Sequence, residues 1–248
     1  MRTFKTHRKR ALPFRLLLLA AGALMLMGAL APRANASLIA YFNFEDSTNG
    51  GAPDFTSDVP PGAFSTTITT NYVAGNMDSL SPGLALNVAP GDLDPNLLAL
   101  NLRRSSLNNG AHFDIPLNTA QGFFQNMTVT FATQGNGNGF HNVQLFYSTN
   151  GGGTFIAGPS VVLTTALQLV TLAVPVGANN SPLLTLRLVF TGGMSNGNDN
   201  QTQVDNIQIN GTIVPEPATV AGGLLGVLGL CWFQRRRLRS LVPRLRRL

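Results

Sequence analysis

The sequence predicts an all-β fold, a β-sandwich of about ten strands, for the central region at residues 37–213. Short runs rich in β-branched, aromatic and leucine residues alternate there with clusters of Gly, Asn, Pro and Ser. Apolar and polar side chains alternate along 127–131 and 184–188, the pattern of strands with one face buried and the other in water. Many short strands without a convincing helix are expected to bury their apolar faces between two packed sheets.

The expected strands follow one another along the whole central region. Each is a short apolar or alternating run bounded by residues that favour turns. In chain order they are 38–44, 64–70, 84–88, 97–102, 111–115, 127–133, 143–148, 167–174, 183–191 and 203–209. Between Tyr147 and Phe155, Asn150 and the glycines that follow it tolerate positive φ, so this connection is expected to close a hairpin.

The charges are divided sharply between the ends and the centre. The whole chain carries a net charge of +6, with seven basic residues in 1–36 and seven in 235–248. Residues 37–213 hold only three arginines, against ten acidic residues. The basic character therefore belongs to the two ends, and nothing in the central region favours a nucleic-acid partner.

The N-terminal residues 1–36 have the organisation of a signal peptide. Basic residues precede an apolar run at 16–31, and Ala34 and Ala36 supply the small residues of a signal-peptidase site, so the mature chain is expected to begin at Ser37. An uncleaved signal anchor is the alternative, because the apolar run is long for a signal peptide. In either case we expect export through the inner membrane.

The C-terminal residues 214–248 combine three different elements. Val214, Pro215, Glu216 and Pro217 form a short motif, residues 218–233 carry no charge, and Arg235, Arg236 and Arg237 open a basic tail at 234–248. A helix over 218–233 would reach about 24 Å, short of the roughly 30 Å of a bilayer's hydrocarbon core, and Gln234 with snorkelling arginines would have to cover the deficit. The basic tail predicts that everything before Pro215 lies outside the cytoplasm. A buried core helix beside a charged tail is the alternative.

These C-terminal residues resemble the PEP-CTERM sorting signal of Gram-negative, exopolysaccharide-producing bacteria. The resemblance covers 214–248 and implies recognition by an exosortase, with cleavage near Pro215, Glu216 and Pro217. The domain would then be anchored only transiently in the inner membrane and end at the cell surface or outside the cell. The chain departs from the usual pattern in the extra basic, leucine-containing stretch at 238–248.

The central region also resembles, more diffusely, jelly-roll sandwiches of the carbohydrate-binding-module kind. In such jelly rolls the first and last strands lie side by side, and acidic residues there can hold a structural Ca²⁺; the resemblance places Glu45, Asp46 and Asp205 at such a site. Hard oxygen ligands suit calcium. The alternative is that Glu45 and Asp46 begin a solvated turn while Asp205 bonds local backbone.

No motif in the central region indicates catalysis. The chain's one cysteine, Cys231, lies in the apolar C-terminal run, so no disulfide or thiol chemistry is expected in the exported domain. His112 and His141 fit neither a metal-binding spacing nor a nucleophile elbow. We therefore expect no catalytic residues.

The function expected from these features is that of a non-catalytic surface or matrix protein, serving adhesion or exopolysaccharide association. Tyr41, Tyr72 and Tyr147, with abundant Asn, are candidate sugar contacts, although the central region has no Trp. The alternatives are a secreted glycan hydrolase with two acids flanking a cleft, and an inert tail-anchored periplasmic structural protein. Signal peptidase, exosortase and the inner membrane are the expected partners during sorting.

Overall fold

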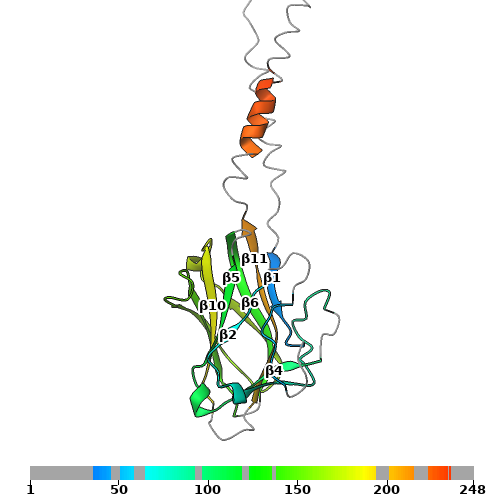
Figure 1. Cartoon of the computed structure of the whole chain (residues 1–248), viewed down its shortest axis with the longest axis vertical. Helices are drawn as coiled ribbons and strands as arrows, with labels where there is room; N and C mark the ends of the chain where they lie inside the picture. Colours follow the sequence, from blue (N-terminus) through cyan, green and yellow to red (C-terminus); the bar gives the residue numbers. More distant parts are fainter. Residues whose placement is uncertain are drawn as a thin grey trace, which may run out of the picture. The chain divides into compact units, whose positions relative to one another are not determined.

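The computed structural model shows two antiparallel β-sheets packed as a sandwich (Figure 1). It describes residues 36–45, 51–58, 65–92, 97–118, 123–135, 138–193, 201–214, 223–233 and 235. The first sheet has the order β3-β4-β11-β6-β9, with β1 also paired to β11. The second sheet has the order β2-β5-β10-β7-β8. The all-β, jelly-roll-like sandwich predicted from the sequence is therefore confirmed.

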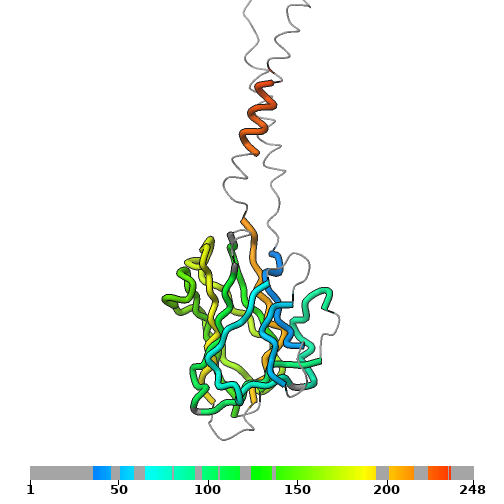
Figure 2. Tube along the Cα trace, viewed as in Figure 1, coloured from blue at the N-terminus to red at the C-terminus, as the bar shows by residue number. Residues whose placement is uncertain are grey.

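The first sheet contains the first and the last strand of the domain. Its strands are β1 (Ala36–Phe42), β3 (Met77–Leu80), β4 (Ala99–Arg103), β6 (Phe123–Gly135), β9 (Gln168–Ala173) and β11 (Gln201–Val214). β1 pairs with the C-terminal half of β11, from Ala36 opposite Thr212 to Phe42 opposite Ile207. Figure 2 shows these two strands, blue and orange, side by side, as the sequence predicted for the first and last strands.

The strands of the second sheet are β2 (Thr69–Thr70), β5 (His112–Asn118), β7 (Asn142–Ser148), β8 (Ile156–Val162) and β10 (Leu183–Thr191). β7 and β8 pair antiparallel across residues 149–155, which confirms the predicted hairpin. Gly151 and Gly152 adopt φ of 71° and 93° in this loop, the left-handed conformation that glycine accepts without a Cβ clash.

The core lies between the sheets and is rich in phenylalanine. Phe113 of β5 and Phe190 of β10 are fully buried, with ring centroids 5.7 Å apart, and Phe131 of β6 lies 6.2 Å from Phe190 across the sandwich. Tyr72 packs on Phe113 with centroids 5.1 Å apart. These contacts explain the alternation in the strands, since every second residue enters this layer.

The expected strand at 84–88 is wrong. Asn87 adopts φ of 60°, and the segment is held by side chains of β11 instead of a backbone ladder. Asn206 donates from Nδ2 to the carbonyl oxygens of Leu84 and Leu86 at 2.7 and 2.9 Å. An apolar run of leucines and valine looks like a strand in the sequence, but its backbone partners are amides and a carboxylate that come from more than a hundred residues away.

The C-terminal prediction falls only partly on described residues. Residues 223–233 are helical, whereas 218–222 lie outside the described residues. Of the helices that the structure describes, none has both the length and the apolar character needed to cross a membrane.

Candidate functional site

Two groups of polar residues stand out, one on each sheet. The first surrounds Asp205 and Asn206 in β11, where the pairing with β6 shifts register between Asp205 and Gln208. A bulge of this kind changes which way successive side chains point. Asp205, Asn206 and Ile207 are consequently buried one after another, and the two polar side chains meet the segment at 84–87.

Asp205 accepts two hydrogen bonds from backbone N–H groups. Leu84 N donates to Oδ2 at 2.7 Å and Asn206 N donates to Oδ1 at 2.8 Å. In the described part of the chain, no basic side chain forms an ion pair with Asp205. Burial above all, and then the charges of Glu45 and Asp92, raise the pKa of Asp205 to about 8, although the two backbone hydrogen bonds oppose the rise.

Amide and hydroxyl groups connect Asp205 to the other two acids. The Tyr41 hydroxyl lies against Asn206 Oδ1 and donates to Asp92 Oδ2 at 2.7 Å. Asn43 Nδ2 donates to Glu45 Oε2 at 3.2 Å and lies 3.5 Å from Asp92 Oδ2. We call Tyr41, Asn43, Glu45, Asp92, Asp205 and Asn206 the acidic cluster.

The acidic cluster contains two of the three predicted calcium ligands, Glu45 and Asp205; Asp46 lies outside the described residues. Among described residues, no three His, Cys, Asp or Glu side chains lie close enough together to hold a metal ion. Carboxylate oxygens are ligands that Ca²⁺ prefers, but between Glu45 and Asp92 the structure places the amide nitrogen of Asn43, which donates to Glu45 and lies 3.5 Å from Asp92 Oδ2. Asp92, Asn43 and Asn206 were not predicted, because they come from separate segments that only the fold brings together.

The second polar group lies on the outer face of the second sheet. Thr69, Asp114, Arg187, Phe146 and Ala157 stand opposite one another on five successive strands, and we call them the outer row. Their neighbours along the strands, such as Ile115, Leu186 and Leu188, are fully buried. The outer row therefore points away from the core.

Arg187 is the centre of the outer row. Its Nε and Nη2 donate to the two carboxylate oxygens of Asp114 at 2.6 and 2.7 Å, a bidentate pair. Its guanidinium carbon lies 3.6 Å from the ring centroid of Phe155, which the β7–β8 loop brings over the sheet. Such stacking holds a flat, donor-rich group at a fixed orientation on the surface.

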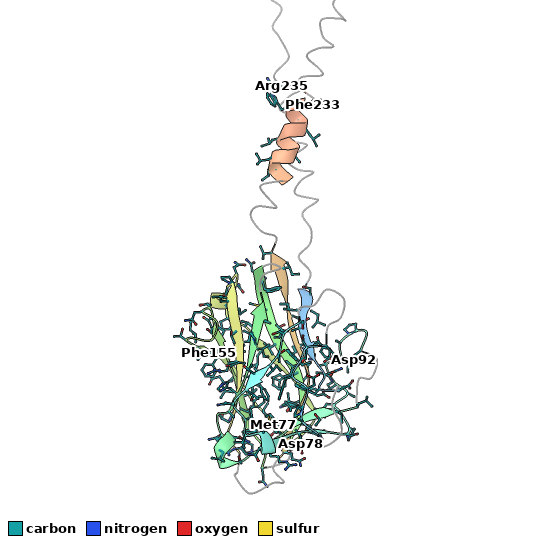
Figure 3. All side chains as sticks on the ribbon, viewed as in Figure 1. Met77, Asp78, Asp92, Phe155, Phe233 and Arg235 are labelled. Carbon is teal, nitrogen blue, oxygen red and sulfur yellow. The ribbon has the colours of Figure 1, made fainter. Side chains whose placement is uncertain are left out.

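His112 lies beside this pair, with Nε2 at 3.7 Å from Asp114 Oδ2. Burial and the Arg187 charge lower the pKa of His112, although the Asp114 carboxylate opposes this. His112 is therefore neutral at pH 7, and the charges of Arg187 and Asp114 balance each other. Phe155 and Asp92 lie on opposite sides of the sandwich in Figure 3, so the outer row and the acidic cluster are separate sites.

The three tyrosines that the sequence offered as sugar contacts are buried. Tyr41, Tyr72 and Tyr147 are 2%, 6% and 7% exposed; Tyr72 and Tyr147 belong to the hydrophobic core, and Tyr41 is buried within the acidic cluster. The aromatic side chains near the outer row are instead Phe146 and Phe155, both half-buried. The alternation of β7 could have indicated Phe146, but the position of Phe155 depends on the loop.

The structure describes only some of the predicted processing residues. Ala36 and Ser37 begin β1, opposite Thr212 and Gly211 of β11, and Val214 is the last residue of β11. Ala34, Pro215, Glu216, Pro217, Arg236 and Arg237 lie outside the described residues, and Arg235 is helical. Cleavage and sorting at these residues therefore stay predictions.

Comparison with known proteins adds a likeness of fold. No protein-family model and no curated protein matches the chain. Solved structures similar to it include the K2 cleaved adhesin domain of Lys-gingipain, at 13% identity and a TM-score of 0.41, over 72% of this chain and 100% of that domain. The CBM22-1 xylan-binding domain of Paenibacillus barcinonensis Xyn10C is 11% identical with a TM-score of 0.40, over 73% and 97%.

A third similar structure is the K3 cleaved adhesin domain of Lys-gingipain from Porphyromonas gingivalis W83, at 13% identity and a TM-score of 0.42, over 70% of this chain and 99% of that domain. At such identities and TM-scores, these likenesses assign no ligand to this chain. The function has to be argued from its own residues.

Proposed function

We propose that this chain is an exported surface protein whose sandwich binds a neutral polysaccharide on the outer row, without catalysis. The observation that carries the proposal is the guanidinium of Arg187, held flat on Phe155 and paired with Asp114 on an outward-facing sheet surface. The group is partly exposed, with 24% of the Arg187 side chain and 20% of the Asp114 side chain accessible.

The chemistry of the outer row suits sugar hydroxyls. A carboxylate and a guanidinium side by side present acceptors and donors at the spacing of adjacent hydroxyl groups, and both are already oriented by their mutual hydrogen bonds. Phe146, opposite Arg187 on the next strand, offers a ring edge or face to the C–H side of a sugar. Because Arg187 and Asp114 neutralise each other, the surface favours a neutral glycan over an anionic one.

Affinity electrophoresis of the purified chain in gels that contain neutral glucans, xylans or mannans tests this proposal. Arg187→Gln is expected to weaken retardation by at least about tenfold in Kd, because a charge-assisted contact is lost. Arg103→Gln is the matched control, since Arg103 is also paired to an aspartate, Asp78, at 2.6 Å, but on the first sheet. Equal retardation of both variants and the unchanged chain would contradict the proposal, and release of reducing ends would indicate a hydrolase instead.

The export and sorting part of the proposal rests on the sequence of the two ends. Mass spectrometry of both termini, in cells with and without exosortase activity, tests it. We expect an N-terminus at Ser37 and a C-terminus between Val214 and Pro217 when exosortase is active, with the C-terminal segment retained when it is not. An intact Leu248 in both cells would instead indicate a tail-anchored periplasmic protein.

We also propose that the acidic cluster takes up Ca²⁺ as a structural ion. The supporting observation is that burial and the charges of Glu45 and Asp92 raise the pKa of Asp205 to about 8, because a bound divalent cation would relieve this repulsion and favour the ionised carboxylate. Glu45 and Asp205 are the described candidates for carboxylate ligands, and Asp46 is a further candidate from the sequence; because no three described acidic side chains lie close enough together, the other ligands would have to be uncharged oxygen atoms. Thermal unfolding at pH 7 is expected to shift upward on adding Ca²⁺ to chelator-treated protein, and an unchanged midpoint would rule out a stabilising ion.

A further inference from the structure

The sandwich protects its sheet edges unequally. β2 is only two residues long, and β3 carries Asp78 in an ion pair with Arg103. β8 contains Pro159 and a register shift against β7, while the outer side of β1 receives a hydrogen bond from Asp58 N to Tyr41 O at 2.8 Å. Short length, charge, proline and bulges are the usual devices that prevent edge-to-edge association.

The edge strand β9 has none of these devices. Its sequence contains no charged residue, proline or glycine, and among described residues it pairs only with β6. Leu169 is 52% exposed on it. The sequence from Ile115 to Leu186, which includes β7, β8 and β9, contains no Asp, Glu, Lys or Arg at all.

The backbone groups that face the open side of β9 can be identified. Val174 N donates to Met127 O of β6 at 2.9 Å, so Val174 is in a hydrogen-bonded pair with β6. In an antiparallel ladder such pairs alternate, so the backbone N–H and C=O groups of Val170 and Leu172 also point toward β6. The N–H and C=O groups of Leu169, Thr171 and Ala173 therefore point outward, toward the open edge.

We infer that this edge pairs with β9 of a second copy of the chain, antiparallel and about a two-fold axis at Thr171. Thr171 then stands opposite the partner's Thr171, and Leu169 stands opposite the partner's Ala173. Each of the three outward-facing residues donates and accepts one backbone hydrogen bond across the axis. The large side chain of Leu169 meets a small one, and the two threonines form a favourable cross-strand pair.

The self-complementary register favours a second copy as the occupant, and the distribution of charge allows it at this edge. Residues 37–213 carry ten acidic residues and three arginines, so two copies repel each other over most of their surface. All of these charged residues lie outside 115–186, and within that range β9 is an edge strand that, among the described residues, pairs with β6 alone. Pairing at β9 joins two like-charged domains without burying or opposing any charge.

Disulfide trapping in the full chain tests this arrangement. With Cys231→Ser as background, Thr171→Cys is expected to give an oxidised dimer, because residues opposite one another in an antiparallel pair have Cα atoms about 5.5 Å apart. Leu169→Cys and Ala173→Cys are each expected to stay monomeric alone, but to form a mixed dimer when combined. Thr154→Cys, exposed in the β7–β8 loop, is the matched control.

In detergent, the apolar ends of the chain could also bring two copies together. Crosslinking that depends on the register of β9 distinguishes the proposed pairing from such contacts. We expect at least about tenfold more dimer from Thr171→Cys than from Thr154→Cys. A monomer from Thr171→Cys would overturn the inference. Equal crosslinking at all four positions would overturn it too, because it would show unspecific contact. Thr171→Lys places two like charges on the axis. It is expected to reduce dimer formation relative to the chain with Thr171.

Discussion

The outer faces of the two sheets each hold an aspartate, but in opposite environments. On the first sheet, residues 84–87 lie against β11, and Asp205 is enclosed with backbone N–H donors and two further acids. On the second sheet, Asp114 stays half-exposed, and its charge is neutralised by Arg187. A carboxylate without a cation is held in its neutral form by burial, whereas one with an arginine keeps its charge at the surface. The first arrangement encloses its polar groups, and the second leaves them partly exposed at the surface.

The largest difference between the two faces is expected in the pH dependence of stability. The pKa of Asp205 rises from 3.8 to about 8 on folding, so between these values the folded chain holds a proton that the unfolded chain has lost. Stability contributed by this group is complete below about pH 4 and is lost as pH rises through about 8, by up to about 1.4 kcal/mol per pH unit. Denaturant unfolding of chelator-treated chain from pH 4 to 8 measures this. A free energy of unfolding that rises over this range, or one with the same slope in Asp205→Asn, would contradict it.

The next largest effect is expected from Asn206→Ala on the covered face. The change removes two hydrogen bonds to the carbonyls of Leu84 and Leu86, and it places alanine at φ of 52°. We expect a loss of about 3 kcal/mol in the free energy of unfolding. Asn210→Ala is the control, since Asn210 is half-buried in the same strand with a 3.3 Å contact to Gln208, and should cost no more than about 0.5 kcal/mol. Equal losses in both variants would show that the covering segment contributes nothing specific.

Removing a tyrosine hydroxyl is expected to have different effects in the acidic cluster and in the core. Tyr41 donates to Asp92 and lies against Asn206, whereas the buried Tyr72 hydroxyl has no partner among described residues. Tyr41→Phe is expected to destabilise the chain by about 1–2 kcal/mol, and Tyr72→Phe to leave stability unchanged or raise it by up to about 1 kcal/mol. Thermal unfolding of the two variants gives both values. Destabilisation by Tyr72→Phe would mean that its hydroxyl is satisfied in solution.

The smallest effect on stability is expected on the open face. Arg187→Gln breaks an ion pair that is partly in water, so the loss should stay below about 1 kcal/mol. The same variant should nevertheless lose neutral-glycan binding, whereas the changes around Asp205 should leave binding intact. Chemical denaturation together with affinity electrophoresis separates the two quantities. A stability loss of several kcal/mol would make Arg187 a structural residue and remove the distinction between the faces.

Most of the fold could be predicted from local pattern. Strands such as β10 and β7 follow from alternation, because each residue's face is set by the two-residue period of an extended chain. The expected strand at 84–88 failed for a reason that local pattern does not contain, since its backbone is satisfied by side chains of Asp205 and Asn206. The prediction that three tyrosines contact a sugar failed for a related reason. Composition alone does not tell an exposed ring from a core ring, and packing placed all three inside.

By itself, the sequence determined the all-β class, the hairpin at 147–155, the uncharged stretch between Asp114 and Arg187, and the residues that predict export and sorting. The tertiary structure alone decided which charges meet. Asp114 and Arg187 lie far apart along the chain and become neighbours only when β5 and β10 pair, while Asp205 acquires Glu45 and Asp92 as neighbours but no described cation. The physical reason is that periodicity fixes the face on which a residue lies, whereas strand order fixes what stands beside it.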